Sequence, residues 1–329
     1  MENRLLVSSS PHIQTGTKVS TIMRDVIIAL LPATLAGIYF FGISAAINVA
    51  VAVIGAVVAE FITQKLMKKP VTISDLSAVV TGLLLAMNVP PTLPWWITLI
   101  GSIFAIVVAK QLFGGIGHNF INPALAARAV LLASWPVPMT TWTAPGADAV
   151  STATPLSIIK AATSFPIRPF ANPEVLAEVS NGVGNITLTD MIIGRTGGCI
   201  GEASAILLLL GGLYLIYRGV ISYHVPVVYL ATVFILTFIF SGFELTMAIY
   251  NLFAGGLFLG AFFMATDYAS SPVNTRAQIV YAFGCGFLTS LIRYYGGYPE
   301  GVSYSILLMN VATPLLDKFI VPKKFGEVA

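Results

Sequence analysis

One polar stretch interrupts an otherwise apolar chain, and its residue types suit the formation of a phosphoester. The stretch, residues 147–157, reads ADAVSTATPLS and places the carboxylate of Asp148 a few residues before a group of hydroxyls. A phosphoester needs a hydroxyl nucleophile, and small neighbours such as Ser151 leave room for a modifying enzyme around Thr154. Pro155 restricts the backbone that follows. Taken alone, the same residues also fit an ordinary polar turn.

A second group of polar residues lies within or beside apolar segments, where each is costly unless it faces protein, water or a ligand. These residues are Asp75, Asn88, Asn119, Asn122, Glu202, Asp267, Asn310 and Asp317. Many such residues cap helices, and Asn122 before Pro123 has the form of an N-cap. Asn119 and Asn122 lie three apart and also offer amide donors and acceptors to a flat heterocycle near the cytoplasmic side.

The composition predicts that these residues belong to a membrane protein. Of the 329 residues, 57% are hydrophobic and 9% are charged, and the mean hydropathy is +0.88. The formal net charge of +3 fits basic cytoplasmic loops and does not indicate nucleic-acid binding. The polar start of the chain lacks the layout of a cleaved signal peptide. We therefore expect a multi-pass protein of the cell (inner or cytoplasmic) membrane, in contact with lipid.

The apolar segments predict an all-α polytopic fold. A bilayer core about 30 Å thick requires about twenty apolar residues per helix, and roughly ten segments meet that need. They are residues 26–42, 44–62, 76–88, 95–113, 123–135, 203–217, 225–240, 245–264, 277–292 and 304–320. With the N-terminus in the cytoplasm, most of the 17 Lys and Arg residues, Lys110 among them, fall on the cytoplasmic side. Both termini are therefore predicted to be cytoplasmic.

This topology divides the chain into five parts. Residues 1–25 form a cytoplasmic segment, and residues 26–135 form the first transmembrane half with five helices. Residues 136–201 form an extracytoplasmic loop that contains the hydroxyl-rich stretch. Residues 202–320 form the second half with five helices, and residues 321–329 form a cytoplasmic tail. Similar cues in both halves, a GG pair followed by an Asn-containing helix, predict a 5+5 inverted repeat.

Several kinds of chemistry have no support in the sequence. Cys199 and Cys285 are too far apart for a disulfide framework or a metal-ligand cluster. The patterns GxxxxGK, GxGxxG, HExxH and CxxC do not occur, which argues against nucleotide hydrolysis, nicotinamide binding and metal hydrolysis by this chain. No residue is assigned to catalysis or to a metal.

The hydroxyl-rich stretch resembles a flavin-attachment motif. Residues 148–154 fit the pattern D-x-x-[S/T]-x-A-T of the RnfD/NqrB family. This family includes the D subunit of the Rnf ferredoxin:NAD oxidoreductase and the B subunit of the sodium-pumping NADH:quinone oxidoreductase. Other stretches resemble the family in the same order: SSSPH, SDLSAVVTGLLLAMNVPP, NFINPALAARA, GGCIGEAS, MATDYASSPVN and GGYPEGVSYSILLMN. The short N-terminal region favours the Rnf-type D subunit.

The resemblance implies two flavins. The last threonine of the family motif carries FMN through a phosphoester, which implies covalent FMN on Thr154, with Asp148 and Ser151 as supporting motif residues. It also implies an FMN transferase that works outside the cytoplasm with FAD and magnesium, and a second flavin, riboflavin, held noncovalently between helices. We assign riboflavin to three of the polar residues named above: Asn119, Asn122 and Asp267.

The same resemblance predicts a membrane subunit of a redox-driven Na⁺ or H⁺ pump. The chain would relay electrons as one of several Rnf-type subunits, in a complex that transfers electrons from ferredoxin to NAD, and would not be catalytic alone. Coupling to ion movement needs a water-accessible acid. The candidates for this ion pathway are Asp75, Glu202 and Asp267.

Two other functions fit part of the sequence. A channel or secondary transporter of the inverted-repeat type would explain ten helices and a repeat without a redox centre, and would purify colourless. A membrane scaffold would leave the complex fully active when Thr154 is changed to alanine. Neither alternative explains the match over residues 148–154.

Overall fold

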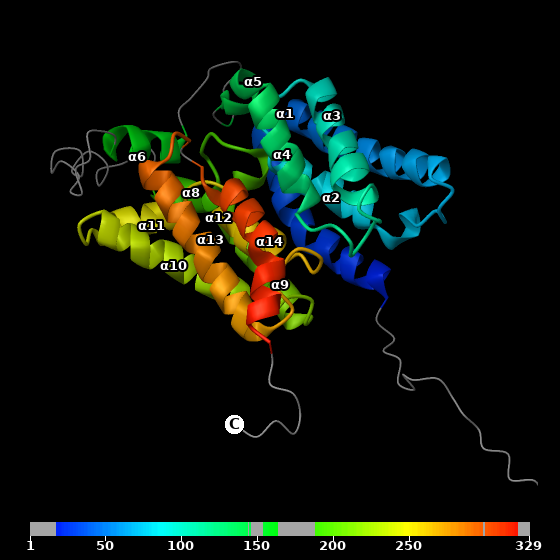
Figure 1. The fold of residues 1–329 in the computed structure, drawn as a ribbon. Coiled ribbons are helices and arrows are strands. Elements are labelled where there is room, and N and C mark those ends of the chain that lie inside the picture. The colour runs from blue at the N-terminus through cyan, green and yellow to red at the C-terminus, as the bar shows by residue number, and fades with distance from the viewer. Residues whose placement is uncertain (1–17, 144, 146–153, 164–187, 299, 322–329) are drawn as a thin grey trace, which may run out of the picture.

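The computed structural model describes residues 18–143, 145, 154–163, 188–298 and 300–321 (Figure 1). Within these residues every regular element is a helix and none is a β-strand, which confirms the all-α fold class. The apolar character of the helices agrees with the expected membrane protein.

The first half begins with a long helix that is broken at one residue. Helix α1, Val19–Leu66, has helical geometry throughout except at Gly42, where φ is 72° and ψ is −154°. Glycine adopts such a positive φ without steric cost, so the chain changes direction there and the two predicted segments remain distinct. The next elements are η1 (Ile73–Asp75), α2 (Ser77–Met87), α3 (Trp95–Ile106), the π-helix η2 (Val107–Gln111), α4 (Pro123–Ser134) and α5 (Pro136–Thr140).

The second half contains a helix that is broken more sharply. The elements up to that point are α6 (Pro155–Thr163), α8 (Leu188–Ile193), η3 (Ile200–Glu202), α9 (Ala205–Tyr217), α10 (His224–Phe240) and α11 (Leu245–Phe253). Helix α12 (Leu257–Leu259) and the π-helix η4 (Gly260–Met264) then continue at 65° to α11. Helices α13 (Thr275–Tyr295) and α14 (Val302–Phe319) complete the fold.

The number of membrane spans stays a prediction. By length and composition, α1 qualifies as a spanning helix, and α11 with α12–η4 qualifies as a bent pair. Most other apolar helices have 10–17 residues, fewer than a bilayer core requires of an isolated straight helix. Helix boundaries nevertheless agree closely with the apolar segments, as α4 and α9 illustrate.

The helices of each half pack mainly against one another, and the halves meet at a shared core. Helix α1 packs against α2, α3 and α9, whereas α13 packs against α10 and α14. Figure 1 shows the blue to green first half beside the yellow-green to red second half, with α4 next to α14 where they meet. Close approach depends on small residues: a Cβ at Gly82 of α2 would lie 2.6 Å from the carbonyl oxygen of Ala52 in α1.

Candidate cofactor sites

Thr154 stands at the start of α6, in the position of an N-cap. Its Oγ1 accepts a hydrogen bond from the backbone N–H of Ser157 at 3.1 Å. Its carbonyl oxygen accepts from Ser157 Oγ at 2.8 Å and from the N–H of Ile158 at 3.1 Å. Thr154 is buried, with 4% of its surface exposed. The other two motif residues, Asp148 and Ser151, lie outside the described residues.

Helix α6 is fixed to the rest of the fold by apolar packing and by one lysine. Leu156 and Ile159 are buried in a small core with residues of α8 and α11. Lys160 Nζ donates to the carbonyl oxygens of Gly296 and, at 2.8 Å, Tyr298, beyond the C-terminal end of α13. Partial burial lowers the pKa of Lys160. The position of Thr154 is therefore tied to α11 and α13.

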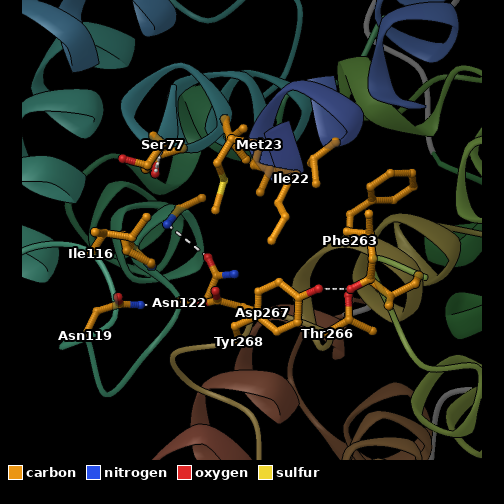
Figure 2. Close-up of a pocket in the computed structure, with 18 of the residues that line it drawn as sticks. Ile22, Met23, Ser77, Ile116, Asn119, Asn122, Phe263, Thr266, Asp267 and Tyr268 are labelled. Carbon is orange, nitrogen blue, oxygen red and sulfur yellow. Dashed lines mark hydrogen bonds between the residues drawn. The ribbon is translucent and has the colours of Figure 1, made fainter. Parts of the chain in front are cut away.

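The three residues assigned to a second flavin line one pocket. Asn119 Nδ2 donates to Asp267 Oδ2 at 3.3 Å, although the two residues are far apart in the sequence. Asn122 Nδ2 donates to the carbonyl oxygen of Met264 at 3.4 Å. All three side chains border the pocket. Figure 2 shows Asn119, Asn122 and Asp267 opposite Met23 of α1.

Asn122 is also the N-cap that the sequence predicts. Its Oδ1 accepts from the backbone N–H groups of Ala124 at 3.1 Å and Leu125 at 3.3 Å, and Pro123 occupies the first helical position of α4. The cap therefore uses the amide oxygen, the amide nitrogen donates to Met264, and the same residue lines the pocket.

The remaining walls of this pocket are mainly apolar. They include Ile22, Met23, Val80, Leu84, Leu215, Phe262 and Phe263. Apolar walls with a few polar groups at one side suit a heterocycle such as a flavin. The free volume of about 100 Å³ is below the ~300–1,000 Å³ of typical ligand pockets. A three-ring ligand would thus require side-chain movement, for which the flexible Met23 is suited.

Asp267 is held in a hydrogen-bonded turn at the end of η4. Ser270 Oγ donates to Asp267 Oδ2 at 2.9 Å, and the Ala269 N–H donates to Oδ1 at 3.5 Å. Burial raises the pKa of Asp267, while these hydrogen bonds and the positive charge of Lys110 act in the opposite direction. The pKa of Asp267 therefore depends in part on the charge of Lys110, which lies on another wall of the pocket.

A buried ion pair that the sequence did not reveal adjoins the pocket, with Lys110 in the pocket wall and Glu60 behind it. Lys110 Nζ lies 2.9 Å from Glu60 Oε1, and the two side chains are 3% and 1% exposed. Gln111 Nε2 donates to the same Glu60 oxygen at 2.6 Å. Lys110, which was counted among the cytoplasmic charges, is buried and ion-paired in η2, and its side of the membrane stays a prediction. The available signal was Glu60, the sole acid in the predicted segment 44–62.

The three acids proposed for an ion pathway lie in different surroundings. Asp75 Oδ1 accepts from the N–H of Ser77 at 2.8 Å and from Ser77 Oγ at 2.6 Å, which caps the start of α2. Ser77 in turn lines the pocket that contains Asp267. Glu202 lies in another cluster, where its carboxylate, Glu300 and Cys199 Sγ come within 4.8 Å of one another.

Arg128 completes the cluster around Glu202. Its guanidinium donates to Glu300 and Ser303, and it lies 3.7 Å from Cys199 Sγ. Burial and the neighbouring Glu300 raise the pKa of Glu202. The cluster borders the break between α11 and α12, since a Cβ at Gly256 would lie 3.6 Å from Glu202 Oε1. A titratable carboxyl therefore adjoins a broken helix, as in many transporter sites.

Nearly the whole chain matches one known protein family. The model of the NQR2, RnfD, RnfE family matches residues 6–326. The chain belongs to this family. The matched range includes Thr154 and every residue named above for the pocket. The match confirms the family resemblance that the sequence motifs indicated.

The similar family members include proteins named for ion translocation. The chain is 52% identical over 328 residues to the D subunit of the Na⁺-translocating ferredoxin:NAD⁺ oxidoreductase complex of Acetobacterium woodii, with 99% of this chain and 96% of the relative covered. It is 48% identical over 331 residues to the D subunit of the proton-translocating ferredoxin:NAD⁺ oxidoreductase complex of Clostridium ljungdahlii, with 99% and 97% covered. The D subunit of an ion-translocating oxidoreductase complex from Aliivibrio salmonicida is 36% identical over 359 residues, with 98% of each chain covered.

Proposed function

We propose that this chain is the D subunit of an Rnf-type complex that couples electron transfer from ferredoxin to NAD to the movement of Na⁺ or H⁺. The similarity to two relatives so named, over nearly the full length of each chain, carries this proposal. The chain acts with other Rnf-type subunits in the cytoplasmic membrane and is not catalytic alone. The names of the two relatives differ in the ion, so they do not decide between Na⁺ and H⁺.

We further propose that Thr154 carries FMN through a phosphoester on Oγ1. The motif over residues 148–154 supports this assignment. The N-cap geometry supports it too, because Oγ1 already faces a backbone N–H of the first turn of α6. An anionic phosphate attached there benefits from the positive end of the α6 helix dipole. An FMN transferase outside the cytoplasm would attach the group to this extracytoplasmic loop.

For the second flavin, riboflavin, we propose the pocket formed by Asn119, Asn122 and Asp267. Their amide and carboxyl groups offer donors and acceptors that fit the polar edge of an isoalloxazine, and the apolar walls fit its rings. A bound flavin would supply electron transfer at this place. The residues of this chain bind and orient it and exclude water from it.

The ion pathway is proposed to involve Asp75, Glu202 and Asp267. Asp75 and Asp267 adjoin the flavin pocket directly or through Ser77, which would let charge in the pocket influence both carboxyl groups. Glu202 adjoins the α11–α12 break on the side of the fold that contains α6. Cytoplasmic termini and an outer flavin loop complete the proposed topology.

The test is the Thr154→Ala variant of the purified complex, with Thr154→Ser as the matched control. We expect Thr154→Ala to lose the flavin fluorescence that stays with the chain after denaturation. The rate of ferredoxin-dependent NAD reduction should fall at least ~100-fold, which corresponds to about 2.7 kcal/mol in the activation barrier. Thr154→Ser retains a hydroxyl and should keep both signals. Full activity in Thr154→Ala would favour the scaffold alternative, and a colourless chain that conducts a solute alone would favour the transporter.

A further inference from the structure

Lys110 is held in place by groups from two other elements. It lies in the π-helix η2, and its Nζ contacts Glu60 of α1 at 2.9 Å and donates to Ser77 Oγ of α2 at 2.6 Å. Ser77 Oγ in turn donates to Asp75 at 2.6 Å. Gln111 and Gln64 donate to Glu60 at 2.6 and 3.3 Å, so the carboxylate is itself oriented. The ammonium therefore has a fixed position.

Burial of the Glu60–Lys110 ion pair carries a large desolvation free energy. Desolvating a carboxylate and an ammonium costs free energy that their attraction repays only in good geometry, and an apolar pair of similar volume often serves stability as well. Charges at membrane depth carry a further penalty and usually mark function. A π-turn within a helix is also uncommon and frequently adjoins a functional site. Two separate features, the buried ion pair and the π-helix, thus indicate that Lys110 does more than join α1 to η2.

The lysine faces the second-flavin pocket, and the glutamate stands behind it. Lys110 and Ser77 belong to the pocket wall, whereas Glu60 does not. Asp267 lies on another wall, and the charge of Lys110 acts on it across the pocket. A ligand in this pocket is therefore closer to the positive charge of the pair than to the negative one.

We propose that Lys110, positioned by Glu60 and Ser77, sets the reduction potential of the flavin bound in this pocket. This inference rests on the proposed function, since it requires the second flavin. Addition of one electron to a bound flavin adds one negative charge unless a proton enters with it. A fixed ammonium at the wall stabilises that added charge by Coulomb attraction, which is strong where water is excluded. The lysine thereby makes the flavin easier to reduce.

The experiment uses the whole complex and the double variant Glu60→Gln/Lys110→Met. Replacing both charges avoids a buried carboxylate without a counterion, which would threaten folding in Lys110→Met alone. The intact complex is titrated, and the noncovalent flavin is the one that acid extraction afterwards releases. Its one-electron equilibrium should shift at least tenfold toward oxidation in the double variant, a fall in reduction potential of about 59 mV. The covalent FMN on Thr154, titrated in the same sample, should not shift.

Two controls separate the charge from the structure. Lys110→Arg keeps the positive charge and should remain nearer to wild type than to the double variant. Lys65→Met removes an exposed lysine at the end of α1 and should leave both potentials unchanged. Melting temperature and subunit composition establish that each complex is folded and assembled.

The possible results separate this inference from the proposed function. If acid extraction of the wild-type complex releases no flavin, the second-flavin proposal is wrong and this inference falls with it. If the wild type releases flavin and the double variant, folded and assembled, titrates like it, only the role of Lys110 is wrong. An equal shift in Lys110→Arg would also contradict it, because the charge is then not the cause.

Discussion

At the scale of single residues, Asn122 both caps a helix and lines the pocket. Its oxygen caps α4 through the N–H groups of Ala124 and Leu125, and its nitrogen reaches the carbonyl oxygen of Met264. The sequence offered capping and ligand binding as alternatives, but the geometry allows both. Asp75 follows the same pattern, since it caps α2 and also extends a hydrogen-bonded chain to Lys110.

Glu202 is predicted to make stability depend on pH. Burial and Glu300 raise the pKa of Glu202, so the folded chain keeps this proton at a pH where the unfolded chain has lost it. The contribution of this group is therefore fully present below the ordinary glutamate pKa of about 4.3 and is lost as pH rises through the raised value. Glu202→Gln does not titrate and lacks this loss.

The measurement compares melting temperatures of wild type and Glu202→Gln in detergent from about pH 5 to about pH 9, a window that follows from the direction of the shift. We expect the wild type to lose stability relative to the variant as pH rises. Parallel curves would show that the carboxyl is already ionised throughout the window.

At the scale of elements, the contact between α1 and α2 depends on the absence of a side chain at Gly82. A Cβ there would lie 2.6 Å from the carbonyl oxygen of Ala52 and 2.8 Å from the Cα of Val53, which are backbone atoms that cannot rotate away. Gly82→Val should therefore destabilise the fold by about 1–3 kcal/mol through overpacking. Gly297→Ala is the matched control, because nothing lies within 4 Å of a Cβ at Gly297.

Thermal unfolding of both variants in detergent checks this prediction. Gly82→Val should melt well below wild type, and Gly297→Ala should melt close to it. If Gly82→Val melts with the wild type, α1 and α2 are farther apart than these distances require.

The elements also show which parts of the fold the sequence could predict. Apolar runs bounded by Pro, Gly and Asn predict helices such as α4 and α9 to within two residues, because capping is a local property. The break between α11 and α12 was missed because segment 245–264 contains no charged residue or proline that marks it, although Gly255 has a φ of 72°. The Glu60–Lys110 pair was missed because its partners are 50 residues apart and no local pattern joins them.

At the scale of the whole molecule, the proposed topology predicts opposite labelling of two exposed positions. Val137 in α5 is 73% exposed and should face the outside, whereas Lys68 after α1 is exposed and should face the cytoplasm. The native thiols Cys199 and Cys285 are buried, so they give little background. In intact cells, a membrane-impermeant maleimide should label Val137→Cys and should label Lys68→Cys only after permeabilisation. The reverse pattern would invert the topology.

The packing of the two halves explains why the geometry of the proposed second-flavin pocket needed a three-dimensional structure. Asn119 and Asp267 come from different halves and meet at 3.3 Å, and the sequence suggested their proximity only through the proposed repeat and the family resemblance. Thr154, in contrast, was proposed as the attachment site from a short contiguous motif. A local motif can be read from sequence, while a site built between halves depends on how α1, α2, η2 and η4 pack.

The central claim is that an outer-face threonine carries a flavin. Peptide mass spectrometry on the chain from its native host tests it most directly, on the fragment that contains Thr152 and Thr154. We predict the mass of FMN minus water on Thr154, located by fragmentation. The same mass on Thr152 would keep the redox function but move the attachment site. An unmodified fragment, from cells that attach flavin to other proteins, would contradict the claim and leave a transporter without a redox centre as the better explanation.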